Sequence, residues 1–501
     1  MTLSLIIWMP IATALLLFLA PVNNARLARW VALIPMLVVL LLAGHVFSRL
    51  GGGALMDWDP AFSVACLWVG DLGIGYHLAV SRLSAMLILL TALAGTAAIA
   101  VSSVEKNARH FYALGLLMVG GMAGAFASVD LFFFYIFHEF ALIPTFLLVG
   151  IWGGEHRRRA AMKITLYLGL ASLVLLVGLI ALYLATGGKT FNLVEMKQLI
   201  ASGAGPDPDA QILIFGLLFL GFGTLVAVVP FHTWAPMGYG EAPALAAMLH
   251  AGVIKKFGLY GLMVVAAPLL PEGFQYWTPV IIGLGAANLV YGGYVAMQQK
   301  DLRYMLAYAS VSHMGYAFLA LASGTAIATQ GFVLFLFAHG LTAALGFGVA
   351  GWLREQTGTS VMAEMGGLAK RMPFLAAIFT MTALAGFGLP GFASFPAELM
   401  IFFGSFEKFP WATVLAVWTT VISAIYLLRA VRSLFLGPLP ERWMKVADAG
   451  GRIRMALILL MAALLMAGFW PRSILGNAPD RLPVEIASLF AKTFGDRPEE
   501  R

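Results

Sequence analysis

The sequence predicts an all-α, polytopic membrane protein with about 14 transmembrane helices. Hydrophobic residues make up 61% of the 501 residues, charged residues only 11%, and the mean hydropathy is +0.90. A soluble globular domain carries roughly 25% charged residues. Apolar runs of about 20 residues, the length that crosses a bilayer, recur along the chain.

The apolar runs give the predicted spans in chain order. They are residues 3–20, 29–47, 82–102, 110–128, 131–150, 162–185, 211–239, 244–268, 277–298, 302–323, 328–353, 374–405, 411–436 and 453–470. The first run has no basic segment before it and no small-residue cleavage site after it. This pattern favours a retained helix over a cleaved signal peptide.

The segments outside the spans leave little material for a soluble domain. Residues 48–80 alternate in polarity and contain turn residues, which predicts a short hairpin on the outer face. Residues 186–210 and 439–452 are typical of surface linkers. Residues 471–501 predict a short helix followed by a charged tip.

Two of the predicted spans contain prolines and glycines that interrupt a helix. Pro230 lies in the seventh span and Pro390 in the twelfth. A membrane helix tolerates such a break where protein or water satisfies the freed backbone groups. Because the two spans are five apart, spans 4–8 and 9–13 are expected to form two inverted five-helix repeats. The alternative is a pair of proline kinks that serve packing alone.

This symmetry predicts four regions of the chain. They are helices 1–3 with the outer hairpin loop (residues 1–109), the first repeat with helices 4–8 (110–270), the second inverted repeat with helices 9–13 (271–438), and helix 14 with the tail (439–501).

Lysine and arginine are distributed unevenly between the loops. Of the 31 basic residues, nineteen follow spans 1, 3, 5, 9, 11 and 13. By the positive-inside rule these nineteen face the cytoplasm and both termini lie on the outer side. The net charge of +7 follows from these loops and does not indicate nucleic-acid binding.

Ionisable residues at membrane depth are the strongest indication of function. Each charge at the centre of a span costs about 2.5–3.5 kcal/mol, so it needs a partner, water or a function. Carboxylate, imidazole and amine groups can exchange protons near neutral pH when burial and neighbouring charges shift them. The set therefore predicts a path for protons or ions. Its members are Glu139, Lys255, Lys256, His313, His339 and Glu398.

Each candidate also has a structural alternative. Glu139 could cap a helix or form a salt bridge. Lys255 could extend its amine to the membrane–water interface or pair with another charge. Lys256 has Gly252 and Tyr260 on its helical face, which favours a lined site. Any of the histidines could instead be a core residue hydrogen-bonded to a hydroxyl or carbonyl group. These are His138, His250, His313 and His339.

The sequence offers no site for a metal or redox cofactor within the chain. A single cysteine, Cys66, excludes a disulfide, an iron–sulfur cluster and a cysteine-held zinc in this chain. The segment GGKT at 187–190 lacks the first glycine of a phosphate loop, where Tyr183 stands. Any redox chemistry is therefore expected in a partner.

Six segments between about residues 110 and 405 carry a family resemblance. They are FHEFALIPTFLLVGIWG, VVPFHTWAP, AGVIKKFGLYGL, DLRYMLAYASVSHMGYAFLAL, AHGLTAALGF and MGGLAKRMPFLAAIFTMTALAGFGLPGFASFPAELMIFFGSF. In combination they resemble the antiporter-like membrane subunits of proton-pumping NADH:quinone oxidoreductase (complex I). The glutamate at Glu398 and the early end after the last span favour the M, or chain 4, type over its L and N siblings.

The resemblance implies a role for each buried group. Glu139 would couple to neighbouring subunits, Lys256 would be the central relay lysine, and Glu398 would end the path toward the outer side. His313 and His339 would link these groups. It further implies L-like and N-like partner subunits, a bacterial inner membrane, and NAD, FMN, iron–sulfur clusters and quinone held by partner subunits.

Alternative functions share this fold. The chain could belong to a multisubunit cation/proton antiporter or a bicarbonate-uptake assembly, or be a non-pumping scaffold of the membrane arm.

One position departs from the family pattern. The family usually has a lysine in span 7 that pairs with the glutamate of span 5, and alignment on VPFH puts Leu225 there. The leading candidate for a displaced partner of Glu139 is Lys255, and His232 is a second. His250 and His138 are further possible relay groups or substitute partners.

Overall fold

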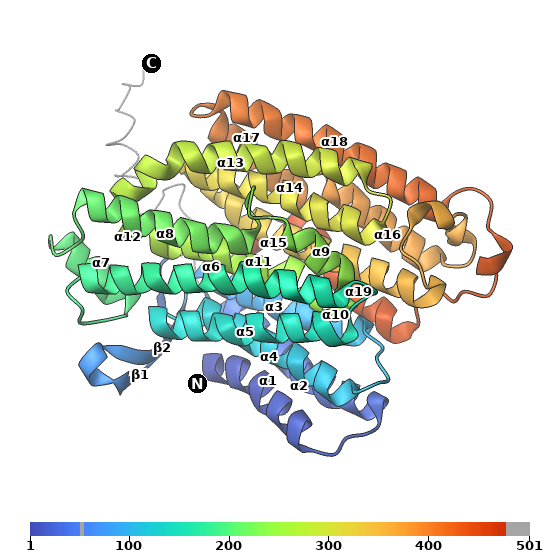
Figure 1. Cartoon of the computed structure of the whole chain (residues 1–501), viewed down its shortest axis with the longest axis horizontal. Coiled ribbons are helices and arrows are strands. Elements are labelled where there is room, and N and C mark those ends of the chain that lie inside the picture. The colour runs from blue at the N-terminus through green and yellow to red at the C-terminus, as the bar shows by residue number, and fades with distance from the viewer. Residues whose placement is uncertain (51–54, 477–501) are drawn as a thin grey trace.

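Long helices that run nearly parallel to one another make up most of the molecule (Figure 1). The computed structural model describes residues 1–50 and 55–476. Within these residues, thirteen helices are long and apolar enough to cross a membrane. Two shorter apolar helices follow each other where the twelfth span was predicted. The prediction of an all-α protein with about 14 spans is therefore confirmed.

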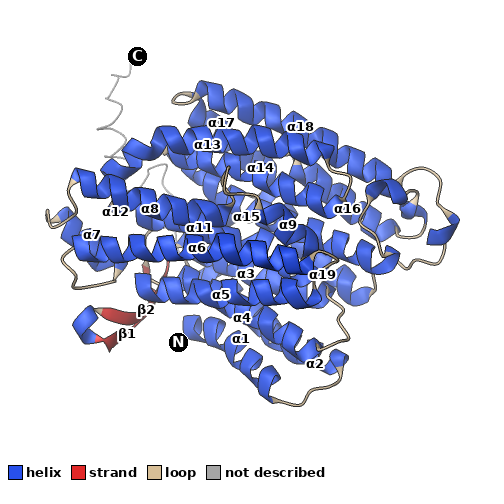
Figure 2. Ribbon diagram, in the orientation of Figure 1, coloured by secondary structure: helices blue, strands red, loops and turns tan. Residues whose placement is uncertain are grey.

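The N-terminal part of the chain forms three membrane helices and a β-hairpin (Figure 2). Most of α3 is enclosed by other helices, whereas fewer than half of the residues of α1 and α2 are buried. The bounds are α1 (Thr2–Leu19), α2 (Ala25–Arg49), β1 (Asp59–Val69), β2 (Ile74–Val80) and α3 (Arg82–Val101).

The predicted hairpin forms between β1 and β2, which pair antiparallel with Cys66 opposite Tyr76. Gly73 follows the short turn between the strands with a φ of 63°, a left-handed conformation that glycine adopts without strain. Asp130 accepts hydrogen bonds from the N–H groups of Gly75 (2.9 Å) and Phe132 (2.9 Å). One carboxylate therefore caps α5 (Leu131–Trp152) and binds the hairpin to it.

The next helices begin at side chains that cap them. Asn192 accepts hydrogen bonds from the first turn of α7, and Asp207 does the same for α8. The bounds are α4 (Ala108–Ala127), α5 (Leu131–Trp152), α6 (Arg157–Ala185), α7 (Leu193–Ala201) and α8 (Pro208–Val226).

The first predicted break lies between α8 and α9 (Trp234–Glu241). Ala227 ends α8 in a left-handed conformation with a φ of 70°. The side chain of Asn288 then accepts from the Val229 N–H at 2.8 Å and donates to the Ala227 carbonyl at 3.0 Å. A single amide thus satisfies backbone groups that the break leaves free at membrane depth.

The helix that carries both lysines is irregular. It consists of α10 (Ala244–Leu249), a π-helical segment (His250–Ile254), α11 (Lys255–Gly261), a second π-helical segment (Leu262–Ala266) and α12 (Ala267–Leu269). Single π turns inside α-helices occur often at functional sites, because they change which side chains share a face.

The second half of the chain repeats the pattern of long helices around a broken one. Gly388 and Gly391 in the second break have φ values of 71° and 102°. A Cβ on Gly468 of α19 would collide with the carbonyl of Gly391, so α19 packs directly on this break. The bounds are α13 (Pro271–Gln298), α14 (Leu302–Ser323), α15 (Ala326–Thr357), α16 (Pro373–Gly386), α17 (Ser394–Phe406), α18 (Pro410–Phe435), α19 (Gly451–Phe469) and α20 (Arg472–Leu475).

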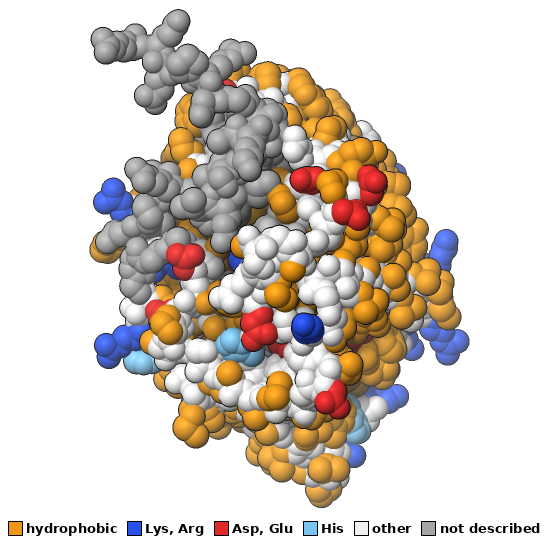
Figure 3. Space-filling model, turned by 90° about the vertical axis from the view of Figure 1, so that its left-hand side faces the viewer, with side chains coloured by type: hydrophobic (Ala, Val, Ile, Leu, Met, Phe, Trp, Pro, Cys, Tyr) orange, Lys and Arg blue, Asp and Glu red, His pale blue; other side chains and the backbone are white. Residues whose placement is uncertain are grey.

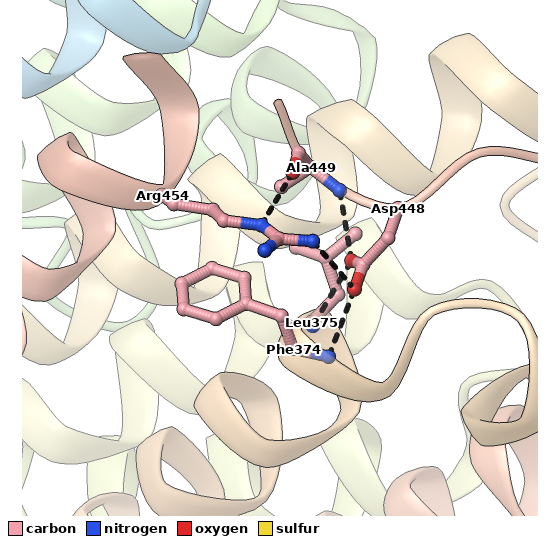
Figure 4. Close-up of polar contacts among 5 residues, drawn as sticks. All are labelled: Phe374, Leu375, Asp448, Ala449 and Arg454. Carbon is pink, nitrogen blue, oxygen red and sulfur yellow. Dashed lines mark hydrogen bonds and ion pairs between the residues drawn. The ribbon is translucent and has the colours of Figure 1, made fainter. Parts of the chain in front are cut away.

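The linker before α19 holds the first turn of α16 (Figure 4). Asp448 accepts hydrogen bonds from the N–H groups of Phe374 at 2.9 Å and Leu375 at 3.3 Å. Arg454 lies 3.5 Å from the same carboxylate and over the Phe374 ring. The linker predicted at 439–452 is therefore bound to the broken helix. The predicted tail beyond residue 476 lies outside the described residues.

The end of the bundle that carries the hairpin and α7 is seen in Figure 3. Charged side chains are scattered over this end, while hydrophobic side chains continue along the flank of the bundle. Such an apolar flank suits a bilayer.

Candidate functional site

Lys256 lies in the enclosed centre of the bundle and contacts α15. Its side chain is fully buried, and its Nζ hydrogen-bonds to the Ala251 carbonyl at 2.9 Å and to Nδ1 of His339 at 2.8 Å. A Cβ on Gly340 would approach the Gly252 carbonyl to 2.8 Å, so these two glycines let the π-helical segment His250–Ile254 and α15 come close. The space beside Gly252 is therefore filled by the backbone of α15.

Tyr260 does not bind Lys256, although the two share a helical face. Its hydroxyl donates to the Phe126 carbonyl at 3.4 Å.

Lys255 points toward α14 rather than α15. Its Nζ donates to Oγ of Ser310 at 2.8 Å and to the Ser310 carbonyl at 3.2 Å. Oγ of Ser310 also lies 3.2 Å from Nε2 of His339. The two lysines are thus the ends of one hydrogen-bonded line, Lys256–His339–Ser310–Lys255, built from three helices.

His313 lies one turn after Ser310 on α14. Its ring meets the ring of His339 edge to face, with 5.8 Å between the centroids. Nε2 of His313 lies 3.4 Å from Oγ of Ser423, which accepts from the Tyr426 hydroxyl at 3.1 Å. The structure thus brings both predicted linking histidines together and continues their contacts to α18.

A small hollow lies beside the two histidines. Its volume is about 40 Å³, and Ser310, His313 and His339 line it together with Thr342 and Thr382. A cavity of about 15 Å³ holds one water molecule when polar groups line it. The hollow therefore has room for water between the polar side chains.

Glu398 lies against the second break, as the sequence predicts. It is 5% exposed, and a Cβ on Gly388 would be in contact with its carboxylate. α17, the helix of Glu398, packs against α14 and α18, which carry Tyr316 and Tyr426. The contacts of His313 with α18 therefore lead to the helix next to Glu398.

Glu139 lies toward the outer flank of the bundle, with 23% of its side chain exposed. It accepts a hydrogen bond from Ser172 of α6, which also contacts the Tyr135 hydroxyl at 3.0 Å. Nδ1 of His138 is 3.5 Å from its Oε1. The expected partner Lys255 instead binds Ser310, so that prediction is wrong in this structure.

The remaining candidate histidines occupy different places. His232 lies in the first break, with its ring 5.0 Å from that of Tyr291, and neither ring nitrogen has a hydrogen-bond partner among the described residues. His250 is buried, and its Nδ1 lies 3.3 Å from the Tyr239 hydroxyl. The Tyr239 ring in turn lies 5.5 Å from Nζ of Lys255. His250 therefore joins the Lys255 end of the line.

Two hollows lie on the side of the bundle where the basic loops gather. Their volumes are about 330 Å³ and 670 Å³, and both are lined by Glu241 and Arg354. Glu241 accepts from the Tyr304 hydroxyl at 3.1 Å and from the His156 N–H at 3.1 Å. The buried guanidinium of Arg303 binds the Tyr239 and Ala242 carbonyls between these hollows and the relay.

The family model described as NADH:quinone oxidoreductase/Mrp antiporter, TM, matches residues 127–423. The chain is 33% identical to NADH-quinone oxidoreductase subunit M of Escherichia coli (strain K12), over 91% of this chain and 92% of that protein. It is 38% identical to NAD(P)H-quinone oxidoreductase chain 4 3 of Picosynechococcus sp., over 86% of this chain and 79% of that protein.

Solved structures give the same fold. A chain of respiratory complex I from Thermus thermophilus with bound NADH superposes with a TM-score of 0.86 and 31% identity, covering 99% of this chain and 100% of that one. A chain of the Mrp complex from Dietzia sp. superposes with a TM-score of 0.82 at 21% identity, covering 98% of each chain. The second likeness shows the fold alone.

Proposed function

Because the chain belongs to the NADH:quinone oxidoreductase/Mrp antiporter transmembrane family, we propose that it is a proton-translocating membrane-arm subunit of an NADH:quinone oxidoreductase. The resemblance to subunit M, or chain 4, is confirmed by relatives of those names. The chain is a multi-pass membrane protein, with thirteen membrane-length helices among the described residues.

The observation that carries this proposal is the buried line Lys256–His339–Ser310–Lys255. Each neighbouring pair lies within 3.2 Å, and every member is buried. Imidazole and hydroxyl groups both donate and accept, so they can pass a proton between the two amines. Because like charges repel strongly in a low-dielectric site, protonation of one lysine disfavours protonation of the other.

Toward the outer side, the proposed path runs from His339 to His313 and on to Glu398. Ser423 and Tyr426 supply hydroxyl groups on α18, which contacts His313 and packs against α17, the helix of Glu398. Water in the hollow beside His313 would complete the steps that the side chains do not span. Glu398 would then hold the proton before its release.

Entry is proposed from the arginine-rich side, which the positive-inside rule assigns to the cytoplasm. The hollows around Glu241 lie on that side, and the smaller one reaches Arg303, whose guanidinium binds the carbonyl of Tyr239. Tyr239 leads to His250 and Lys255. In this arrangement both chain termini face outward and the membrane is the bacterial inner membrane.

Coupling to electron transfer is proposed to enter through Glu139. This carboxylate is the one relay group with a side chain open to the flank of the bundle, where a neighbouring L-like or N-like subunit would pack. The cofactors of the reaction, NAD, FMN, iron–sulfur clusters and quinone, are proposed to reside in partner subunits, since the sequence has a single cysteine. The chain would then be part of a translocase without a redox site of its own.

The fold is shared with a cation/proton antiporter, so the alternatives need a direct experiment. The complex should be purified through a tag on this chain and reconstituted in liposomes. The proposal predicts that redox subunits copurify and that NADH oxidation by quinone moves protons in a protonophore-sensitive way. Isolation without redox subunits, with sodium/proton or bicarbonate transport, would support the other assemblies instead.

A further inference from the structure

His138 is a buried titratable residue that is not part of the proton path proposed above. Its side chain is 1% exposed, and neither ring nitrogen has a hydrogen-bond partner among the described residues. Its closest ionisable neighbour is Glu139, with Nδ1 to Oε1 at 3.5 Å, an ion-pair distance without hydrogen-bond geometry. Buried polar atoms are nearly always hydrogen-bonded, so an imidazole left without a bond beside a carboxylate requires an explanation.

The imidazole is held in place by stacking. It lies parallel to the Phe257 ring at 4.1 Å between centroids, and Phe134, one turn earlier on α5, stacks on the same ring at 4.3 Å. Phe257 directly follows Lys256 on α11. The ring of His138 is therefore fixed between the Glu139 side chain and the helix of the two lysines.

The same layer of the bundle contains Leu225. Phe222 of α8 packs edge-on against Phe134 at 6.2 Å and Phe257 at 5.8 Å. Leu225 follows Phe222 by one helical turn and is 1% exposed. Since His138 likewise follows Phe134 by one turn, both residues lie one turn beyond this aromatic cluster. In this layer α8 supplies a leucine and α5 supplies an imidazole.

A connection toward Lys255 begins at His250. Nε2 of His250 has no hydrogen-bond partner among the described residues, while its Nδ1 faces Tyr239. The π-helical segment that contains His250 packs against α5, the helix of His138. The π-helical turn connects His250 to Lys255, because the Lys255 N–H donates to the His250 carbonyl.

We propose that His138 is the proton partner of Glu139 in this chain, and that His250 connects it to Lys255. The proposal rests on the proton-translocating function proposed above. A proton moves from Oε1 of Glu139 to Nδ1 of His138, which leaves a carboxylate and an imidazolium. The imidazolium then releases a proton from Nε2 toward His250, directly or through water.

The experiment uses the assembled complex reconstituted in liposomes. His138→Phe keeps an aromatic ring on Phe257 and removes the titratable group. Loss of an acid–base group slows its proton transfer by about 100-fold or more, so coupled quinone reduction and proton uptake are expected to fall together. His45→Phe, at an exposed histidine on α2, is the matched control and should match wild type.

A double variant separates proton transfer from packing. Leu225→Lys added to His138→Phe places an amine in the same layer and is expected to restore pumping. Because lysine releases its proton at higher pH than histidine, the pH profile of the restored activity should move to the alkaline side. A packing role predicts neither the recovery nor the shift.

Two outcomes would overturn the inference. In the first, the His138→Phe complex pumps protons at the wild-type rate while the Lys256→Ala complex is inactive. In the second, the His138→Phe complex assembles normally and is defective, and adding Leu225→Lys does not restore its pumping. Wild-type pumping in both the His138→Phe and the Lys256→Ala complexes would instead refute the proposed function.

Discussion

Nζ of Lys256 lies 2.8 Å from Nδ1 of His339, which joins the irregular helix of the lysines to α15 in the enclosed centre of the bundle. The other nitrogen of the same imidazole, Nε2, faces Ser310 at 3.2 Å. His339 thus contacts both Ser310, which binds Lys255, and the ring of His313. An imidazole in this position can receive a proton at one nitrogen and release one at the other.

Ser310 is predicted to carry the connection between Lys255 and His339. Ser310→Ala removes a hydroxyl that bonds a charged amine, an interaction worth about 1.5–3 kcal/mol, so proton-coupled quinone reduction should fall by roughly 10- to 100-fold. Ser310→Thr keeps the hydroxyl and should retain most activity. Ser48→Ala on the exposed part of α2 is the control. Equal activity in Ser310→Ala and wild type would remove Ser310 from the path.

Glu241 is predicted to serve proton entry from the arginine-rich side. Glu241→Gln keeps an acceptor for the Tyr304 hydroxyl but cannot exchange a proton. The variant complex should assemble normally and pump several-fold more slowly, measured as the initial rate of proton movement at a fixed NADH concentration. Glu441→Gln, at an exposed position outside both hollows, should leave the rate unchanged. A defect of the same size in both variants would contradict the assignment.

The docking of the hairpin is predicted to depend on pH through His77. Burial lowers the pKa of His77 below 6.5, so the folded hairpin favours the neutral imidazole. Its stabilisation is complete above pH 6.5 and is lost as the pH falls from 6.5 through the lower folded-state pKa. Nδ1 of His77 lies 2.6 Å from Nδ2 of Asn192, a contact that protonation would disrupt.

Hydrogen exchange of the hairpin residues tests this dependence. The protection of the hairpin amides, measured as the exchange rate relative to the intrinsic rate at each pH, should fall below pH 6.5 in the wild type, and His77→Gln should flatten the response. Unchanged protection across the same range would contradict a role for His77.

Asp448 is predicted to stabilise the first half of the broken helix α16. Asp448→Ala removes acceptors for two N–H groups of the first turn, which should lower stability by about 1 kcal/mol. Asp448→Asn keeps one oxygen acceptor and should lose less. Thermal unfolding of the purified complex in detergent gives the comparison, and identical midpoints for all three proteins would argue against the cap.

The helical architecture could be predicted closely from the sequence, because lipid requires each span to be apolar and to satisfy its own backbone. Both breaks were predicted from Pro230 and Pro390, and α8 and α16 do end before these residues. The satisfying group at the first break, Asn288, comes from α13, and local sequence does not reveal such a partner.

The ionisable members of the site could also be predicted, since each interrupts an apolar run. The hydroxyls between them were missed. Ser310 lies three residues before His313 on the same helical face, and this spacing is a signal that sequence reasoning can use. Ser423 and Tyr426 enter from α18, and only helix packing decides that contact.

The prediction for Lys255 failed for a specific physical reason. The π-helical segment His250–Ile254 precedes it and alters the helical register, so Lys255 faces Ser310 on α14. The prediction rested on the missing lysine at Leu225, and local sequence does not reveal that α14 offers Ser310 to this side chain.

The most direct test of the account is proton movement per NADH oxidised by the assembled Lys256→Ala complex in liposomes. Lys445→Ala, in an exposed loop, is the matched control. The account predicts that both variant complexes assemble normally and that the Lys445→Ala control pumps protons like the wild type. In the Lys256→Ala complex, proton transfer through this position should slow by about 100-fold, which abolishes coupled pumping. Wild-type pumping by an assembled Lys256→Ala complex would contradict it.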